Sequence, residues 1–131
     1  MKFKLKLPIQ SFHTLASKRY FQLTGFLSIV LLGLTTLLPI WQLFPGLQDQ
    51  FAIPLHYNIH FGIDLFGPWW QIFTIPFAGL LALIINAIGM LYSWKKDKVL
   101  SYFFATATVL VELILFVAMI FVVLLNLAYG I

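Results

Sequence analysis

The sequence predicts an all-α integral membrane protein with three transmembrane helices, a cytoplasmic N-terminus, an external C-terminus and an extended outer loop. Two observations predict this fold class. The composition is 62% hydrophobic and only 9% charged, with a mean hydropathy of +0.99, whereas a soluble domain carries about 25% charged residues. The chain also contains three apolar stretches that are long enough to cross a bilayer. Eight basic and four acidic side chains cannot cover a water-facing surface of this size, and a disordered chain needs a far lower hydrophobicity.

The three apolar stretches define the predicted membrane spans at residues 20–44, 69–94 and 101–129. The first two contain no charged residue, and the third contains one, Glu112. Each run of about 25 residues gives a helix of about 37 Å, which exceeds a hydrocarbon thickness of about 30 Å. The spans must be helical because three strands cannot close a barrel in lipid. The first run is longer than the roughly 7–15 residues of a signal-peptide core, so we expect an uncleaved anchor.

The basic residues determine the expected orientation. They all precede the first span or lie between the second and the third: Lys2, Lys4, Lys6, Lys18, Arg19, Lys95, Lys96 and Lys98. The outer loop at residues 45–68 contains neither Lys nor Arg. By the positive-inside rule, the turn at residues 95–100 is cytoplasmic, and so are residues 1–19, a basic arm or an interfacial helix with Ser11 as its N-cap. We expect the protein in the cell membrane, specifically the bacterial inner membrane.

Small and polar residues predict how the spans pack, because helix association in lipid depends on close approach and on interhelical hydrogen bonds. Folding the chain at residues 95–100 makes the second and third spans an antiparallel helix pair. It aligns four positions in one register: Ser93 with Ser101, Gly89 with Ala105, Asn86 with Thr108, and Ala82 with Glu112. The first span has small or polar residues on one face, which suits docking on this helix pair or on another protein: Gly25, Ser28, Thr35 and Pro39.

Glu112 is the expected polar residue of the membrane interior. A charged group there costs about 2.5–3.5 kcal/mol on insertion scales, so the simplest state is a neutral acid that donates a hydrogen bond to Asn86 or Thr108. That interpretation makes Glu112 a packing residue. The alternative makes it a site for a proton, a cation or a polar partner helix, and the sequence leaves both open. Asn126, near the outer end of the third span, is expected to contact interfacial water.

The outer loop alternates apolar and polar residues from Ile53 to Asp64, which is typical of an extended amphipathic segment. Its polar positions are Pro54, His56, Asn58, His60, Gly62 and Asp64. An unpaired strand of this kind invites a strand from a partner or from a second copy. His56, His60 and Asp64 have metal-site spacing for a helix, but in an extended chain successive members would be about 13 Å apart. We therefore expect no metal and no other cofactor, while the two histidines could make the loop sensitive to pH.

The loop also carries a short motif between the first two spans: Pro54, Leu55, His56, Tyr57 and Asn58, followed by Gly62 and Asp64. It resembles the Pro-x-His-Phe/Tyr-Asn…Gly loop of a bacterial membrane family of unknown function. The same module forms the N-terminal part of immunity proteins against the sporulation-delaying toxin. The similarity covers the first two spans and their loop, about half of the chain. Gly62 is displaced by one residue from the family's spacing and the longer immunity architecture is absent, so the immunity function is not carried over.

The sequence lacks the patterns of an intramembrane enzyme. It has no His-Glu-x-x-His, no Gly-rich phosphate loop, no paired carboxylates and no cysteine. Its basic residues lie in two blocks beside apolar runs, which does not indicate nucleic acid. We therefore expect a non-catalytic subunit or accessory protein in the lipid bilayer, which binds a protein partner or a second copy through its outer loop and helix faces. The alternatives are a proton- or cation-handling element that uses Glu112 in an oligomer, and an immunity or stress-signalling protein.

Overall fold

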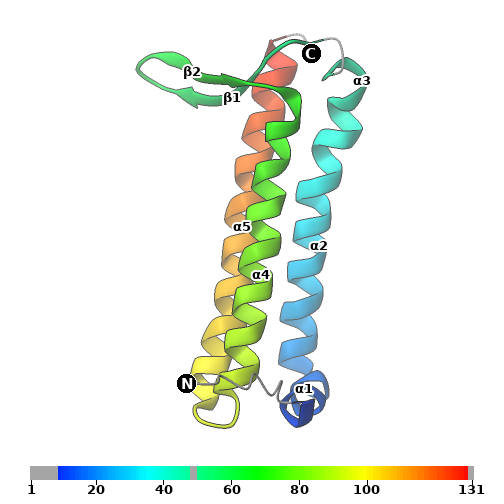
Figure 1. Ribbon diagram of the computed structural model, residues 1–131, viewed down its shortest axis with the longest axis vertical. Helices are drawn as coiled ribbons and strands as arrows, with labels where there is room; N and C mark the ends of the chain where they lie inside the picture. Colours follow the sequence, from blue (N-terminus) through cyan, green and yellow to red (C-terminus); the bar gives the residue numbers. More distant parts are fainter. Residues whose placement is uncertain (1–8, 48–49, 130–131) are drawn as a thin grey trace, which may run out of the picture.

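The computed structural model describes residues 9–47 and 50–129, which form a bundle of long helices with a small β-hairpin at one end (Figure 1). Three helical segments are long and apolar enough to cross a membrane: α2 (Arg19–Gln42), Trp69–Ser93 and α5 (Lys98–Ala128). The middle segment is a 3-10 turn, η1 (Trp69–Phe73), that continues into α4 (Thr74–Ser93). The prediction of three helices long enough to cross a membrane is therefore confirmed, but the chain is mostly helical rather than all-α, because it also has a two-stranded sheet. The expected cytoplasmic positions Lys2, Lys4 and Lys6 lie outside the described residues.

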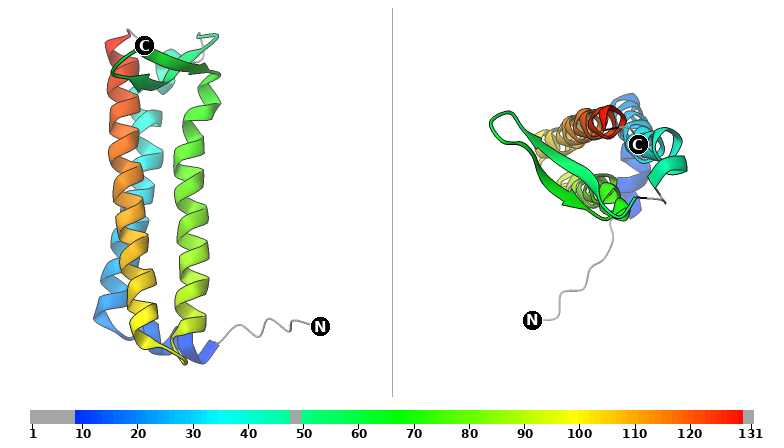
Figure 2. Two further views of the ribbon diagram at one scale, coloured as in Figure 1. Left: turned by 90° about the vertical axis from the view of Figure 1, so that its left-hand side faces the viewer. Right: turned by 90° about the horizontal axis from the view of Figure 1, so that it is seen from above.

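The three long helices pack with α5 at the centre of the contacts. Helix α5 contacts both α2 and α4 extensively, and α2 and α4 contact each other much less (Figure 2). Ser28, Thr35 and Pro39 are buried, so the predicted face of the first span docks within this bundle. Asp97 is the N-cap of α5, and its side chain accepts hydrogen bonds from the backbone N–H groups of Val99 and Leu100 at 2.9 and 3.2 Å.

The end of the bundle that carries the basic residues is closed by aromatic side chains and by α1 (Ile9–Ala16). Leu15 of α1 is buried with Phe21, Trp94 and Ala105. The amino groups of Lys18 and Lys98 lie 5.5 and 5.7 Å from the Trp94 ring centroid, within cation–π range. The expected N-cap Ser11 is wrong, because Ser11 lies inside α1, where its side chain is buried.

A β-hairpin replaces the single extended segment predicted for the outer loop. Strand β1 (Ile53–Asn58) pairs antiparallel with β2 (Gly62–Gly67). The chain reverses at residues 59–61 because the Asn58 Oδ1 accepts the His60 backbone N–H at 2.8 Å and Gly62 adopts a φ of 78°, which glycine tolerates best. The prediction of one continuous extended segment from Ile53 to Asp64 is therefore wrong, and the two strands pair with each other along one edge.

The register predicted for the second and third spans is also wrong at Gly89 and at Glu112, whereas Asn86 and Thr108 do line one cavity. The Ser101 Oγ donates to the Met90 carbonyl at 3.0 Å. A Cβ placed on Gly89 would lie 2.8 Å from the ring of Phe104, so this glycine accommodates an aromatic ring and not Ala105. The large Phe104 ring uses the space that the sequence pattern assigned to a small residue.

Candidate functional site

The root of the β-hairpin is fixed to the helix bundle. Ile53 is buried in a cluster with Leu43, Ile72, Met119 and Val123. The Nδ2 of Asn126 on α5 donates to the Pro54 carbonyl and to the Val122 carbonyl, both at 2.8 Å. Asn126 is fully buried, so the predicted contact with interfacial water is wrong, and the amide instead joins β1 to α5.

The tip of the β-hairpin, residues 59–61, has the opposite character. Figures 1 and 2 show the hairpin extending sideways beyond the helices, across the bundle axis. Ile59 and Phe61 at its turn are 82% and 84% exposed. The hairpin therefore combines a buried root with an exposed apolar tip.

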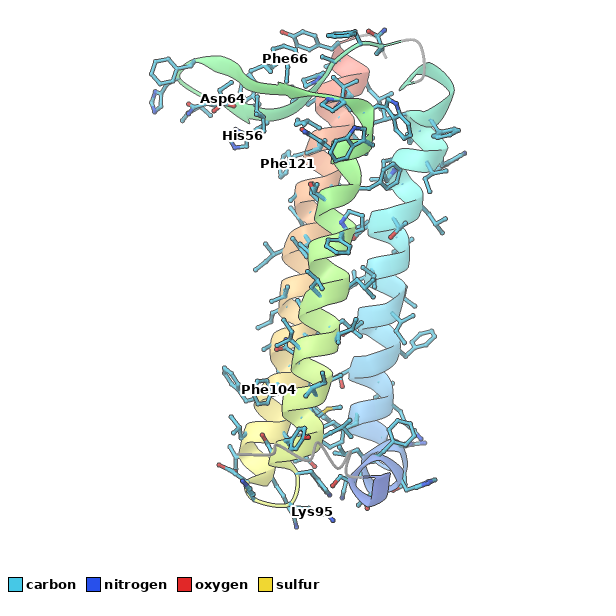
Figure 3. The ribbon with its side chains drawn as sticks, in the orientation of Figure 1. His56, Asp64, Phe66, Lys95, Phe104 and Phe121 are labelled. Carbon is cyan, nitrogen blue, oxygen red and sulfur yellow. The ribbon has the colours of Figure 1, made fainter. Side chains whose placement is uncertain are left out.

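The hairpin brings His56 and Asp64 together (Figure 3). The His56 Nδ1 and the Asp64 Oδ1 lie 2.7 Å apart, and both side chains are exposed. The predicted separation of these two residues is wrong because β2 folds back along β1. His60 lies in the turn, away from this pair. Within residues 9–47 and 50–129, no group of three His, Cys, Asp or Glu side chains is placed to hold a metal ion.

The polar positions singled out in the loop build the hairpin. The Pro54 carbonyl accepts the Asn126 amide, and His56 and Asp64 bridge the two strands. Asn58 and Gly62 shape the turn. The structure therefore gives most of the loop motif a structural task, which the sequence pattern alone did not reveal.

Glu112 lies inside the helix bundle with no exposed surface. It faces Gly79 of α4, where an added Cβ would lie 2.8 Å from the Glu112 Oε2. Neither carboxyl oxygen has a hydrogen-bond partner among the described residues. The predicted hydrogen bond to Asn86 or Thr108 is therefore wrong. The Thr108 Oγ1 donates instead to the Phe104 carbonyl of its own helix at 2.8 Å, and the shifted register places Glu112 beside Gly79.

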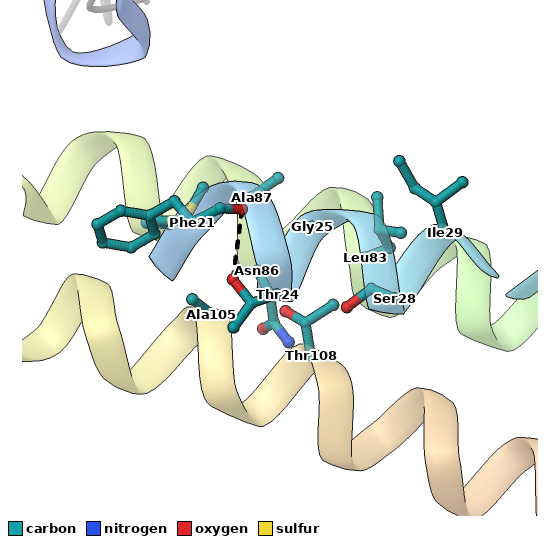
Figure 4. Close-up of a pocket in the computed structure, with 11 residues that line it drawn as sticks. Phe21, Thr24, Gly25, Ser28, Ile29, Leu83, Asn86, Ala87, Ala105 and Thr108 are labelled. Atoms are coloured by element: carbon teal, nitrogen blue, oxygen red, sulfur yellow. Dashed lines mark hydrogen bonds between the residues drawn. The ribbon is translucent and has the colours of Figure 1, made fainter. Parts of the chain in front are cut away.

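Asn86 and Thr108 share a small cavity between α2, α4 and α5 (Figure 4). Its volume is about 100 Å³, and Thr24 and Ser28 of α2 also line it. At about 30 Å³ per molecule, a few water molecules would fit. The Ser28 Oγ is buried without a partner in the described part of the chain. Glu112 lies one helical turn along α5 from Thr108, so the acid lies near a mostly apolar cavity that has four polar side chains in its lining. No pattern in the sequence indicated that Thr24 lines this cavity.

No family model, no curated protein and no solved structure matches this chain. The fold and its surfaces alone define the class of protein. It is a mostly helical protein with three helices long and apolar enough to span a membrane and a two-stranded β-hairpin at one end.

Proposed function

We propose that the protein is a non-catalytic integral membrane subunit or accessory protein that binds a neighbouring membrane protein, or a second copy of itself, through the hairpin tip. The observation that carries this proposal is the contrast between the two ends of the hairpin. Ile53 at the root has no exposed surface, whereas Ile59 and Phe61 at the tip are more than four-fifths exposed. A surface held so firmly is preorganised, which reduces the entropy lost on binding.

The distribution of charge supports an external hairpin. The basic side chains of the described region lie at the end of the bundle opposite the hairpin: Lys18, Arg19, Lys95, Lys96 and Lys98. The positive-inside rule then puts that end in the cytoplasm. The bacterial inner membrane is the proposed location, because the loop motif resembles that of a bacterial membrane family.

The direction of the hairpin favours a partner within the same membrane. If the helices stand across the bilayer, the hairpin runs along its outer surface (Figure 1), and its tip reaches a neighbouring protein. Two means of contact are present. The apolar tip offers exposed surface that a partner can bury. A two-stranded sheet also leaves one edge of each strand open for strand addition.

Photocrosslinking in native membranes tests this proposal. A photoreactive phenylalanine analogue at Phe61 should give one adduct of defined mass with a protein partner or with a second copy. The adduct should disappear with Ile59→Ser and persist with Phe51→Ser, because Phe51 is fully exposed but lies outside the hairpin. The proposal is wrong if the Phe61 probe yields only lipid adducts, or the same adducts as a probe at Lys96.

A second candidate function is proton or cation handling within an oligomer. It is favoured by the carboxyl group of Glu112, which has no hydrogen-bond partner among the described residues, and by the nearby cavity lined in part by Thr24, Ser28, Asn86 and Thr108. An intramembrane acid often marks an ion pathway. Purified protein in vesicles should then conduct protons or a monovalent cation, and Glu112→Gln should abolish that flux. Absence of flux in the wild type rejects this candidate. An immunity or stress-signalling role has only the short loop motif in its favour.

A further inference from the structure

A large apolar groove lies beneath the β-hairpin, between the hairpin and the outward-facing sides of α4 and α5. Its volume is about 650 Å³, within the range of about 300–1,000 Å³ typical of small-molecule sites. Its walls come from three elements: Leu55 and Tyr57 of β1, Ile75 of α4, and Ala118, Phe121 and Leu125 of α5. A second hollow of about 370 Å³ shares Leu55, His56 and Ile75 with it, so the cleft continues toward η1.

The position of this groove points to a lipid as its occupant. Its lower wall belongs to α5, a helix long and apolar enough to cross a membrane. Phe121 is 67% exposed on that wall, so an exposed apolar surface leads directly into the groove. An acyl chain that lies along α5 can therefore enter it without crossing a polar barrier. Tyr57 and Trp70 flank the two hollows, and such amphipathic rings favour the level of the lipid headgroups.

The roof of the groove supplies polar chemistry at one point. His56 lines both hollows, and its Nδ1 lies 2.7 Å from the Asp64 Oδ1. In its charged form, His56 donates the Nδ1–H to Asp64 and retains the Nε2–H for an anion. Asp64 keeps a second oxygen that can accept from a cation. The pair thus offers a donor for a phosphate beside an acceptor for an ammonium group.

We propose that the groove binds one phospholipid molecule with a zwitterionic primary-amine headgroup, of the phosphatidylethanolamine type. One acyl chain occupies the groove along α5, the phosphate accepts from His56, and the ammonium group donates to Asp64. A choline headgroup has no N–H to donate, and a glycerol headgroup carries no positive charge to pair with Asp64. The site is independent of the protein partner proposed for the hairpin tip, because the tip residues Ile59 and Phe61 do not line the groove.

Native mass spectrometry of the full chain, released from mixed micelles, tests this proposal. We titrate phosphatidylethanolamine, phosphatidylcholine and phosphatidylglycerol of the same acyl composition. The wild type should retain one phosphatidylethanolamine, with an affinity roughly tenfold above that for phosphatidylcholine, as expected for one charge-assisted hydrogen bond. Ala118→Trp fills the groove and should abolish retention of every lipid. Val117→Trp is the matched control, because Val117 is exposed on the same helix and does not line the groove.

The headgroup contacts are tested separately on the exposed hairpin, where substitutions leave the helices intact. Asp64→Asn and His56→Ala should remove the preference for phosphatidylethanolamine and leave the retention of phosphatidylcholine unchanged. The proposal is overturned by equal retention in the Ala118→Trp and Val117→Trp variants, by a preference for phosphatidylglycerol, or by a wild-type dimer that carries no lipid. A preference unaffected by both hairpin variants would also overturn it, even if Ala118→Trp failed to fold.

Discussion

Glu112 holds both carboxyl oxygens inside the bundle, and neither has a hydrogen-bond partner within the described residues. A buried polar group left in this state costs about 1–3 kcal/mol. Glu112→Met has a similar length and removes that cost, so we expect it to raise the free energy of unfolding in bicelles by about 1–3 kcal/mol. Glu112→Gln leaves an unpaired amide and should give no such gain.

The sign of the change in unfolding free energy for Glu112→Met shows whether or not Glu112 has a hydrogen-bond partner in the bundle. The hydrogen bond that the sequence predicted to Asn86 or Thr108 would make the Met variant less stable than the wild type. A loss of stability would therefore show that Glu112 has a partner in the membrane, contrary to the geometry beside Gly79.

Asn126 is the residue whose loss should loosen the hairpin. Asn126→Leu removes the donor to the Pro54 carbonyl, and a hydrogen bond of this kind contributes about 0.6–2 kcal/mol in membrane proteins. We expect faster hydrogen exchange in β1 with little change in α4. Leu127→Ala, at the exposed neighbouring position, should leave exchange in β1 at the wild-type rate. Equal effects from both variants would show that Asn126 does not anchor the hairpin.

At the scale of elements, the contact between α4 and α5 depends on glycine. A Cβ on Gly79 would lie 2.8 Å from the Glu112 Oε2 and 3.2 Å from side-chain carbons of Leu115 and Leu32, whereas Gly33 of α2 has nothing within 4 Å. Overpacking costs about 1–3 kcal/mol, and alanine restores about 1 kcal/mol of helix propensity. Gly79→Ala should therefore give a less stable protein than Gly33→Ala, which should leave stability unchanged or raise it. Thermal unfolding of the two variants in one detergent checks this; equal midpoints would contradict the packing.

The long helices could be predicted from the sequence, whereas the β-hairpin could be predicted only in part. Hydropathy predicts the helices because a long uncharged apolar segment is stable in lipid whatever the other helices contact. The alternation from Ile53 to Asp64 correctly indicates extended backbone, but it continues through residues 59–61 and hides the reversal. That reversal depends on an amide contact at Asn58 and on the φ of Gly62. The anchoring role of Asn126 could not be predicted, because Pro54, its partner, lies 72 positions away in the chain.

At the scale of the whole molecule, the two ends of the bundle differ in charge and in exposed apolar surface. One end has lysines, arginine and a buried aromatic cluster; the other has the hairpin with its exposed apolar tip. The proposed function requires that the three long helices span the membrane. It also requires that the hairpin lies on the external side and the basic end in the cytoplasm.

Cysteine labelling in intact cells tests that requirement most directly, since the chain has no cysteine of its own. His60→Cys places a thiol at the exposed hairpin turn, and Lys96→Cys places one at the exposed turn between α4 and α5. A membrane-impermeant maleimide should label residue 60 in intact cells and residue 96 only after the cells are opened. Labelling of residue 96 but not residue 60 would reverse the orientation, and labelling of both would show that the bundle does not span the membrane.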